Sequence, residues 1–70
     1  MNRTSVRSSN IASVGHDPAT NRLEVEFSNG SVYSYSDVPA EKHTALMTAP
    51  SIGMHFAKNI RGVHPAIRES

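Results

Sequence analysis

The sequence contains no cysteine, which excludes both a disulfide and a thiolate metal site. It has no tryptophan, only two tyrosines and two phenylalanines, and no apolar run long enough to span a membrane. The first residues also lack the apolar run of a signal peptide. From these absences we expect a cytoplasmic protein that makes no membrane contact.

The chain is short and its net charge is only +1. Seventy residues suffice for one domain, which is usually of marginal stability by itself. We therefore expect an economical core or the formation of a homo-oligomer to provide the stability of the fold. The charges are unevenly distributed. Residues 1–16 carry two arginines and no acid, residues 17–49 carry five acids, and residues 50–70 carry three basic residues against one acid. If the two ends meet in the fold, they form a basic patch that the net charge conceals.

Residues 10–36 show the pattern of an antiparallel sheet. A first strand is expected at about 10–16, and residues 22–28 alternate apolar and polar side chains with period two. Asn29-Gly30 is typical of a two-residue hairpin turn. That turn would pair Phe27 with Val32, and it would place Tyr33 and Tyr35 beside Glu26 and Glu24 on the uncovered face of the sheet.

The second half of the chain predicts two short helices. Pro39 suits the start of a helix that ends at Pro50, with Leu46 and Met47 facing inward. Ser51 can cap a second helix, whose buried stripe would be Ile52, Phe56 and Ile60 and which Gly62 can end. We therefore predict an α+β fold, a three-stranded antiparallel β-meander followed by two short helices packed on one face. Residues 1–8 are expected to be a flexible lead-in and residues 65–70 a tail.

Four stretches of the chain together resemble the KTSC domain family: "VRSSNIASVGHD", "LEVEFSNGSVYSYSDVP", "APSIG" after Leu46, and "HFAKNIRG". The resemblance implies a single domain over residues 9–64. The family is named for the C-terminal region of some lysyl-tRNA synthetases and also occurs as small stand-alone proteins of bacteria and phages. It implies a small binding module for tRNA or another nucleotide-type ligand, with no enzymatic motif. His16, His55 and His64 stand where the family tends to have an aromatic residue, which favours a hydrogen-bonding or pH-sensitive role at those positions.

Neither a catalytic nor a metal site is predicted. The four histidines lack ligand spacing, and no serine has the context of a nucleophile elbow. The pair Glu24 and Glu26 is expected to be a solvated strand face. No cofactor is expected.

The stretch from Ser51 to Gly62 carries the candidate site. A helix N-terminus presents free backbone N–H groups to an anion, and Gly53 would let a ligand approach the backbone closely. His55, Lys58 and Arg61 are three residues apart, which predicts one polar row on the helix. The candidate ligand-binding residues are Ser51, Gly53, His55, Lys58, Asn59 and Arg61, joined by Tyr33 and Tyr35 if they stack on a base. The competing interpretation is only a turn, a cap and a solvated helix face.

These observations predict a small non-enzymatic module that binds a phosphate-bearing, nucleotide-type ligand. It would sequester a small nucleotide signal, as in phage counter-defence, or contact tRNA or another RNA. The alternative is a protein-interaction module, an inhibitor or adaptor that acts through its sheet face.

Overall fold

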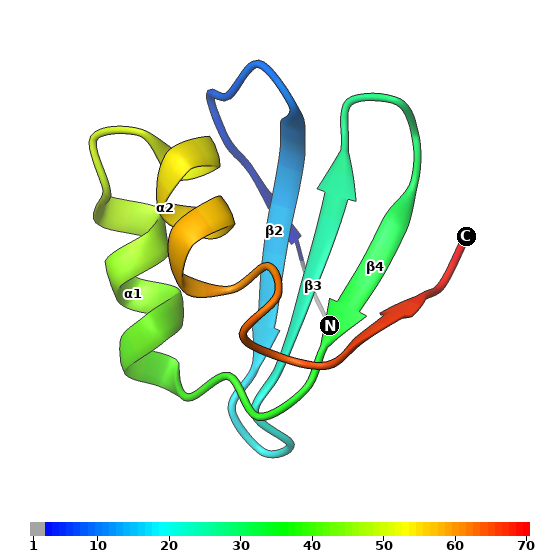
Figure 1. The fold of residues 1–70 in the computed structure, drawn as a ribbon, viewed down its shortest axis with the longest axis vertical. Coiled ribbons are helices and arrows are strands. Elements are labelled where there is room, and N and C mark those ends of the chain that lie inside the picture. The colour runs from blue at the N-terminus through cyan, green and yellow to red at the C-terminus, as the bar shows by residue number, and fades with distance from the viewer. Residues whose placement is uncertain (1–2) are drawn as a thin grey trace.

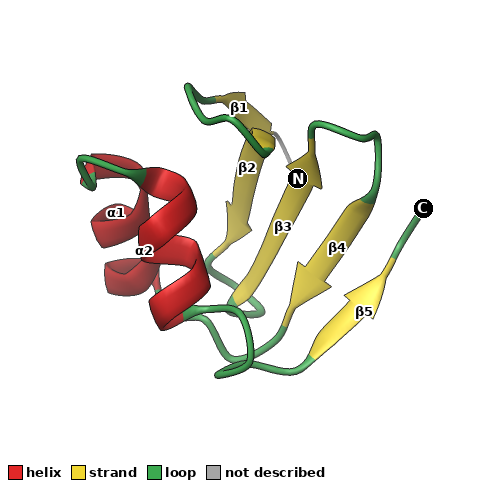
Figure 2. Cartoon of the chain, turned by 45° about the horizontal axis from the view of Figure 1, so that its top comes forward, coloured by secondary structure: helices red, strands yellow, loops and turns green. Residues whose placement is uncertain are grey.

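The computed structural model describes residues 3–70 as one antiparallel sheet and two helices (Figures 1 and 2). The strands lie side by side in chain order, β1-β2-β3-β4-β5, and both helices are inserted between β4 and β5. The elements are β1 (Arg3–Ser5), β2 (Ile11–Asp17), β3 (Arg22–Phe27), β4 (Val32–Tyr35), α1 (Ala40–Thr48), α2 (Ile52–Asn59) and β5 (Ala66–Arg68). No helix within residues 3–70 has the length and apolar character that a membrane crossing requires. The antiparallel sheet and the two helices confirm the predicted α+β class.

The predicted number of strands is wrong, because the sheet has five strands and not three. β1 and β5 fall in the predicted lead-in and tail; the first two residues of that lead-in lie outside the described part of the chain. Both strands are short and exposed, so they carry no hydrophobic alternation. They form because β2 and β4 offer unpaired backbone groups: the N–H of Val6 donates to the carbonyl of Ala12 (3.1 Å), and the N–H of Glu69 to the carbonyl of Val32 (2.7 Å).

The predicted hairpin register is also wrong, by one residue. A two-residue turn of this kind needs positive φ at both central positions, but only Gly30 has it (φ 92°). The chain instead forms a longer loop, closed where the N–H of Phe27 donates to the carbonyl of Ser31 (2.8 Å). Val25 is consequently opposite Tyr33, and Leu23 is opposite Tyr35. Because side chains alternate between faces, the shift moves both tyrosines to the face that carries the core.

The core lies between the sheet and the helices. Its buried members are Ile11, Val14, Leu23, Val25, Tyr35, Val38, Leu46, Phe56 and Ile60. The predicted stripe of the second helix is confirmed, since Phe56 and Ile60 are buried and Ile52 is partly buried against the core. The predicted cap is confirmed as well, because the Ser51 hydroxyl accepts a hydrogen bond from the N–H of Met54.

The helices do not cover the whole of this face. They lie on the side of β2, and the side of the sheet that carries β4 and β5 is left open (Figure 2). The opposite, outer face is polar: Arg3 pairs with Glu24 (2.6 Å), Arg22 pairs with Glu69 (2.7 Å), and Ser13 donates to Glu26 (2.8 Å). Acidic strand residues therefore lie on the side of the sheet away from the tyrosines.

Candidate functional site: an aromatic and basic groove

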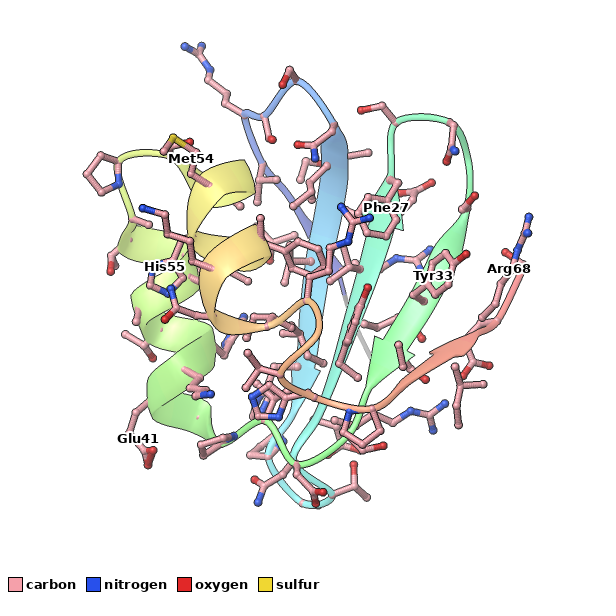
Figure 3. All side chains as sticks on the ribbon, in the orientation of Figure 1. Phe27, Tyr33, Glu41, Met54, His55 and Arg68 are labelled. Atoms are coloured by element: carbon pink, nitrogen blue, oxygen red, sulfur yellow. The ribbon has the colours of Figure 1, made fainter. Side chains whose placement is uncertain are left out.

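An open hollow of about 460 Å³ lies between α2 and the uncovered part of the sheet. This volume falls in the range of small-molecule sites. We call it the aromatic hollow, because Phe27, Tyr33, Tyr35 and Phe56 line it together with Arg61. Figure 3 shows Phe27 and Tyr33 over neighbouring strands beside α2. None of the residues that line this hollow is acidic.

The four rings contact one another edge to face. The Phe27 ring lies 5.8 Å from Tyr33 and 5.6 Å from Phe56, at interplanar angles of 81° and 71°. Tyr35 contacts Phe56 in the same way, at 5.3 Å and 80°. This is a favoured arrangement of aromatic rings and it holds each of them in place. Tyr35 and Phe56 are buried, whereas Phe27 and Tyr33 are only half-buried, so these two can touch a ligand.

Arg61 supplies the positive charge of the aromatic hollow. It follows the end of α2, where its N–H donates to the carbonyl of Phe56 (2.9 Å). Within residues 3–70 its guanidinium has neither an ion pair nor a hydrogen bond. Burial raises the pKa of the Tyr35 hydroxyl, and the nearby charge of Arg61 partly opposes that rise. Arg68 is opposite Tyr33 in the sheet register but does not line the hollow.

A second hollow, of about 480 Å³, adjoins the first. We call it the loop hollow, because Arg7 and residues 8–10 line one side of it and residues 50–54 the other. Asn10 and Ala57 line both hollows, so the two adjoin along α2, and we refer to the pair as the groove. Arg7 follows β1 and Arg61 follows α2. Although they are far apart in the sequence, the two arginines line adjacent hollows.

Ser51 and Gly53 line the loop hollow, but both also serve the fold. The Ser51 hydroxyl occupies one N–H of the helix end as its cap. A Cβ on Gly53 would lie 2.8 Å from Asn10 Oδ1 and 3.3 Å from Ser8 Oγ, so the missing side chain lets residues 8–10 pack closely against α2. Their assignment as ligand-binding residues stays a prediction.

His55, Lys58 and Asn59 line neither hollow. Successive helical residues are about 100° apart, so with Phe56 and Ile60 in the core, Ala57 faces the groove and these three side chains point elsewhere. Figure 3 shows His55 away from Phe27 and Tyr33. The amide of Asn59 donates to the carbonyl of His55 (3.1 Å). The structure thus brings Arg61, Tyr33 and Tyr35 together, and separates them from this polar row.

Two of the histidines at expected aromatic positions make hydrogen bonds. His16 Nε2 donates to the carbonyl of Val38 (2.7 Å), and its ring stacks on His43 at 5.0 Å. His64 Nδ1 lies 3.1 Å from the carbonyl of Ser36, while Lys42 Nζ lies 2.8 Å from Nε2. No three histidine, aspartate or glutamate side chains in residues 3–70 stand close enough to hold a metal ion.

Four residues that line the groove were not predicted from the sequence: Arg7, Asn10, Phe27 and Phe56. The apolar alternation of residues 23–27 marked Phe27 as inward-facing, and only the correct hairpin register adds Tyr33 to the same face. Arg7 carried no comparable signal, because its position depends on how residues 8–10 pack against α2.

The fold and the groove define a small α+β domain with an aromatic and basic groove. Comparison with known proteins identifies its family: the model of the KTSC domain matches residues 7–64, and the chain belongs to this family. The crystal structure of a KTSC domain protein from Yersinia pestis superimposes with a TM-score of 0.93, at 36% sequence identity, and covers 99% of this chain and 97% of that one.

Two kinds of relative share the sequence. An uncharacterised protein of Stutzerimonas stutzeri (strain A1501) is 44% identical over 64 residues, which cover 91% of this chain and 90% of that protein. A lysine–tRNA ligase of Nostoc punctiforme is 43% identical over 52 residues, which cover 74% of this chain but only 9% of the ligase. The domain therefore occurs both in a protein of similar length and as a small segment of a much larger enzyme.

Proposed function

We propose that this domain binds a phosphate-bearing, nucleotide-type ligand in the aromatic hollow and carries out no chemical step on it. The observation that carries the proposal is the composition of the hollow. Half-buried aromatic rings and an arginine without a partner in residues 3–70 line one open space, and no acidic side chain lines it.

Each part of the hollow matches one part of a nucleotide. The exposed surfaces of Phe27 and Tyr33 can contact a base, and stacking of this kind contributes about 1–3 kcal/mol per base. The planar guanidinium of Arg61 can donate two parallel hydrogen bonds to a phosphate. The acids Glu24 and Glu26, which would repel a phosphate chain beside the tyrosines, lie on the outer face.

The proposed site keeps Arg61, Tyr33 and Tyr35 from the residues predicted by sequence and adds Phe27. Tyr35 would act mainly as the buried wall beneath the ligand, since it is only 5% exposed. Ser51 and Gly53 would form the far end of the groove. His55, Lys58 and Asn59 have no assigned role in it.

The relatives support a ligand of nucleic-acid type. The similar segment of the lysine–tRNA ligases belongs to proteins whose name gives tRNA as a substrate. In a stand-alone protein, the same hollow would serve to hold RNA or to sequester a free nucleotide signal, including one made by host defence against a phage. Both uses require the same base and phosphate contacts.

The second candidate function is protein interaction through the sheet, as an inhibitor, an adaptor or one subunit of a homo-oligomer. The observation that favours it is Ile67 in the edge strand β5, which is 60% exposed on the outer face. An Ile67→Lys variant would weaken such an interface and leave the groove intact.

Direct titration tests the nucleotide proposal. The probes are a fluorescein-labelled random single-stranded RNA decamer, followed by anisotropy, and the four nucleoside 5′-monophosphates, followed by calorimetry. We expect Arg61→Ala to weaken binding by about tenfold or more, as for other hydrogen bonds to charged groups. Arg3→Ala is the matched control, because it removes an equal charge from the outer face. The proposal fails if the folded protein binds none of these probes, or if Arg61→Ala binds them as tightly as the original.

A further inference from the structure

We infer that the ligand of this groove is a run of at least two nucleotides, with one phosphate near Arg61 and the next near Arg7. This inference rests on the proposed function and extends it from one hollow to both. Its first support is adjacency: Asn10 and Ala57 line both hollows, so the two hollows are neighbours along α2.

The sizes of the hollows point to more than one nucleotide. Each has a volume within the range of small-molecule sites, about 460 Å³ for the aromatic hollow and about 480 Å³ for the loop hollow. A single nucleotide in the aromatic hollow would leave the loop hollow as unused surface. A second nucleotide would bring a further base and phosphate to it.

The two hollows are alike in charge. Each hollow contains one arginine, Arg61 or Arg7, and no acid among its lining residues. Neither guanidinium has a hydrogen bond or an ion pair within residues 3–70. By contrast, Arg3 and Arg22 on the outer face are paired with glutamates. The arginines that remain available for an anion therefore include one in each hollow.

The loop hollow also has a surface for a second base. Met54 lines it and is 60% exposed, although methionine is an apolar side chain. A flexible thioether can contact an aromatic ring, including that of a base. Ser8, Ser9 and Asn10 place polar groups beside it. The capped N-terminus of α2 is not needed for this recognition.

A run of two nucleotides can belong to a free dinucleotide or to a longer single strand, and the contacts would be the same. Base identity is not specified, because stacking and phosphate contacts are tolerant of sequence. The salt dependence of binding should then reflect two phosphate contacts.

A length series tests the inference, with calorimetry on 5′-phosphorylated mono-, di- and hexanucleotides of adenosine and of uridine. We expect the dinucleotide to bind about tenfold tighter than the mononucleotide, because one more base is stacked and one more phosphate is contacted. Arg7→Ala should remove this gain and leave mononucleotide affinity unchanged, which also shows that the variant is folded. Arg61→Ala should weaken both ligands, and Arg3→Ala neither.

The outcomes separate the two proposals. Equal affinity for mono- and dinucleotide, or an Arg7→Ala variant that keeps the full gain, overturns this inference and leaves the one-nucleotide site standing. Binding of no probe overturns both. If the inference holds, a hexanucleotide that binds no tighter than the dinucleotide identifies a short free ligand, and a further gain identifies a longer single strand.

Discussion

Val25 of β3 lies directly opposite Tyr33 of β4, and both side chains point to the face of the sheet that the helices partly cover. The same register places Glu26 opposite Val32 on the other face. The sheet therefore separates its aromatic side chains from its acidic ones. Because of this separation, no acidic side chain lines the aromatic hollow, which leaves it open to an anion.

Glu26→Gln should leave binding of the labelled RNA decamer unchanged. The carboxylate of Glu26 accepts a hydrogen bond from the Ser13 hydroxyl on the outer face (2.8 Å), and a glutamine amide oxygen can accept the same bond. Fluorescence anisotropy at fixed salt measures the effect. A clear gain in affinity would mean that this acid faces the ligand, which contradicts the observed register.

Tyr33 should contribute through its ring and not through its hydroxyl. We expect Tyr33→Ala to lose about 1–3 kcal/mol of binding free energy, the usual contribution of one stacked base, and Tyr33→Phe to lose little. Calorimetry with the decamer measures both. Thermal unfolding is needed as a control, because the Tyr33 ring also packs against Phe27. An equal loss in the two variants would assign the contact to the hydroxyl instead.

Lys58 and Arg61 should differ, although each carries one positive charge and they are three residues apart in the sequence. Arg61 lines the aromatic hollow and Lys58 does not. For a single strand, each phosphate contact changes the slope of log affinity against log salt by about 0.7. Arg61→Ala should reduce the slope by roughly this amount, and Lys58→Ala by much less. Salt titrations of both variants measure the slopes. Identical reductions would mean that Lys58 also contacts a phosphate of the ligand.

Stability should fall as the pH falls through about 6.5, the ordinary pKa of histidine. Partial burial lowers the pKa of His43, and the neighbouring His16 lowers it further. In that range the unfolded chain therefore takes up a proton that the folded chain resists, and protonation favours unfolding. Above this range both states are neutral at His43, and the effect disappears.

Urea unfolding at several pH values between 5 and 8 measures this effect. His43→Phe is the informative variant, because it keeps a ring against His16 and cannot titrate. It should show a shallower loss of stability on acidification than the original protein. The range stops at pH 5 because Glu69, whose pKa is lowered by hydrogen bonds from Ser34 and Arg22, loses its stabilising charge only in more acid solution. An unchanged slope would assign the pH dependence to another group.

Much of the local structure follows from the sequence alone. The alternation in residues 22–27 predicts β3, and the spacing of Ile52, Phe56 and Ile60 predicts the buried side of α2. Both elements were confirmed, because burial of apolar side chains imposes a period of two on a strand and 3.6 on a helix. The cap at Ser51 was predicted for a similar reason, since it depends on groups only three residues apart.

The tertiary structure decided the register and the site. Asn29-Gly30 is compatible with more than one loop conformation. The observed register between β3 and β4 differs by one residue from the predicted one, and Tyr33 and Tyr35 therefore lie on the core face and not on the face of Glu24 and Glu26. β1 and β5 depend on the backbone groups that β2 and β4 leave unpaired, which no side-chain pattern records. The groove, finally, joins Arg7, Tyr33 and Arg61 from distant parts of the chain. Local patterns therefore determined the elements, whereas pairing and packing between them determined which side chains face a ligand.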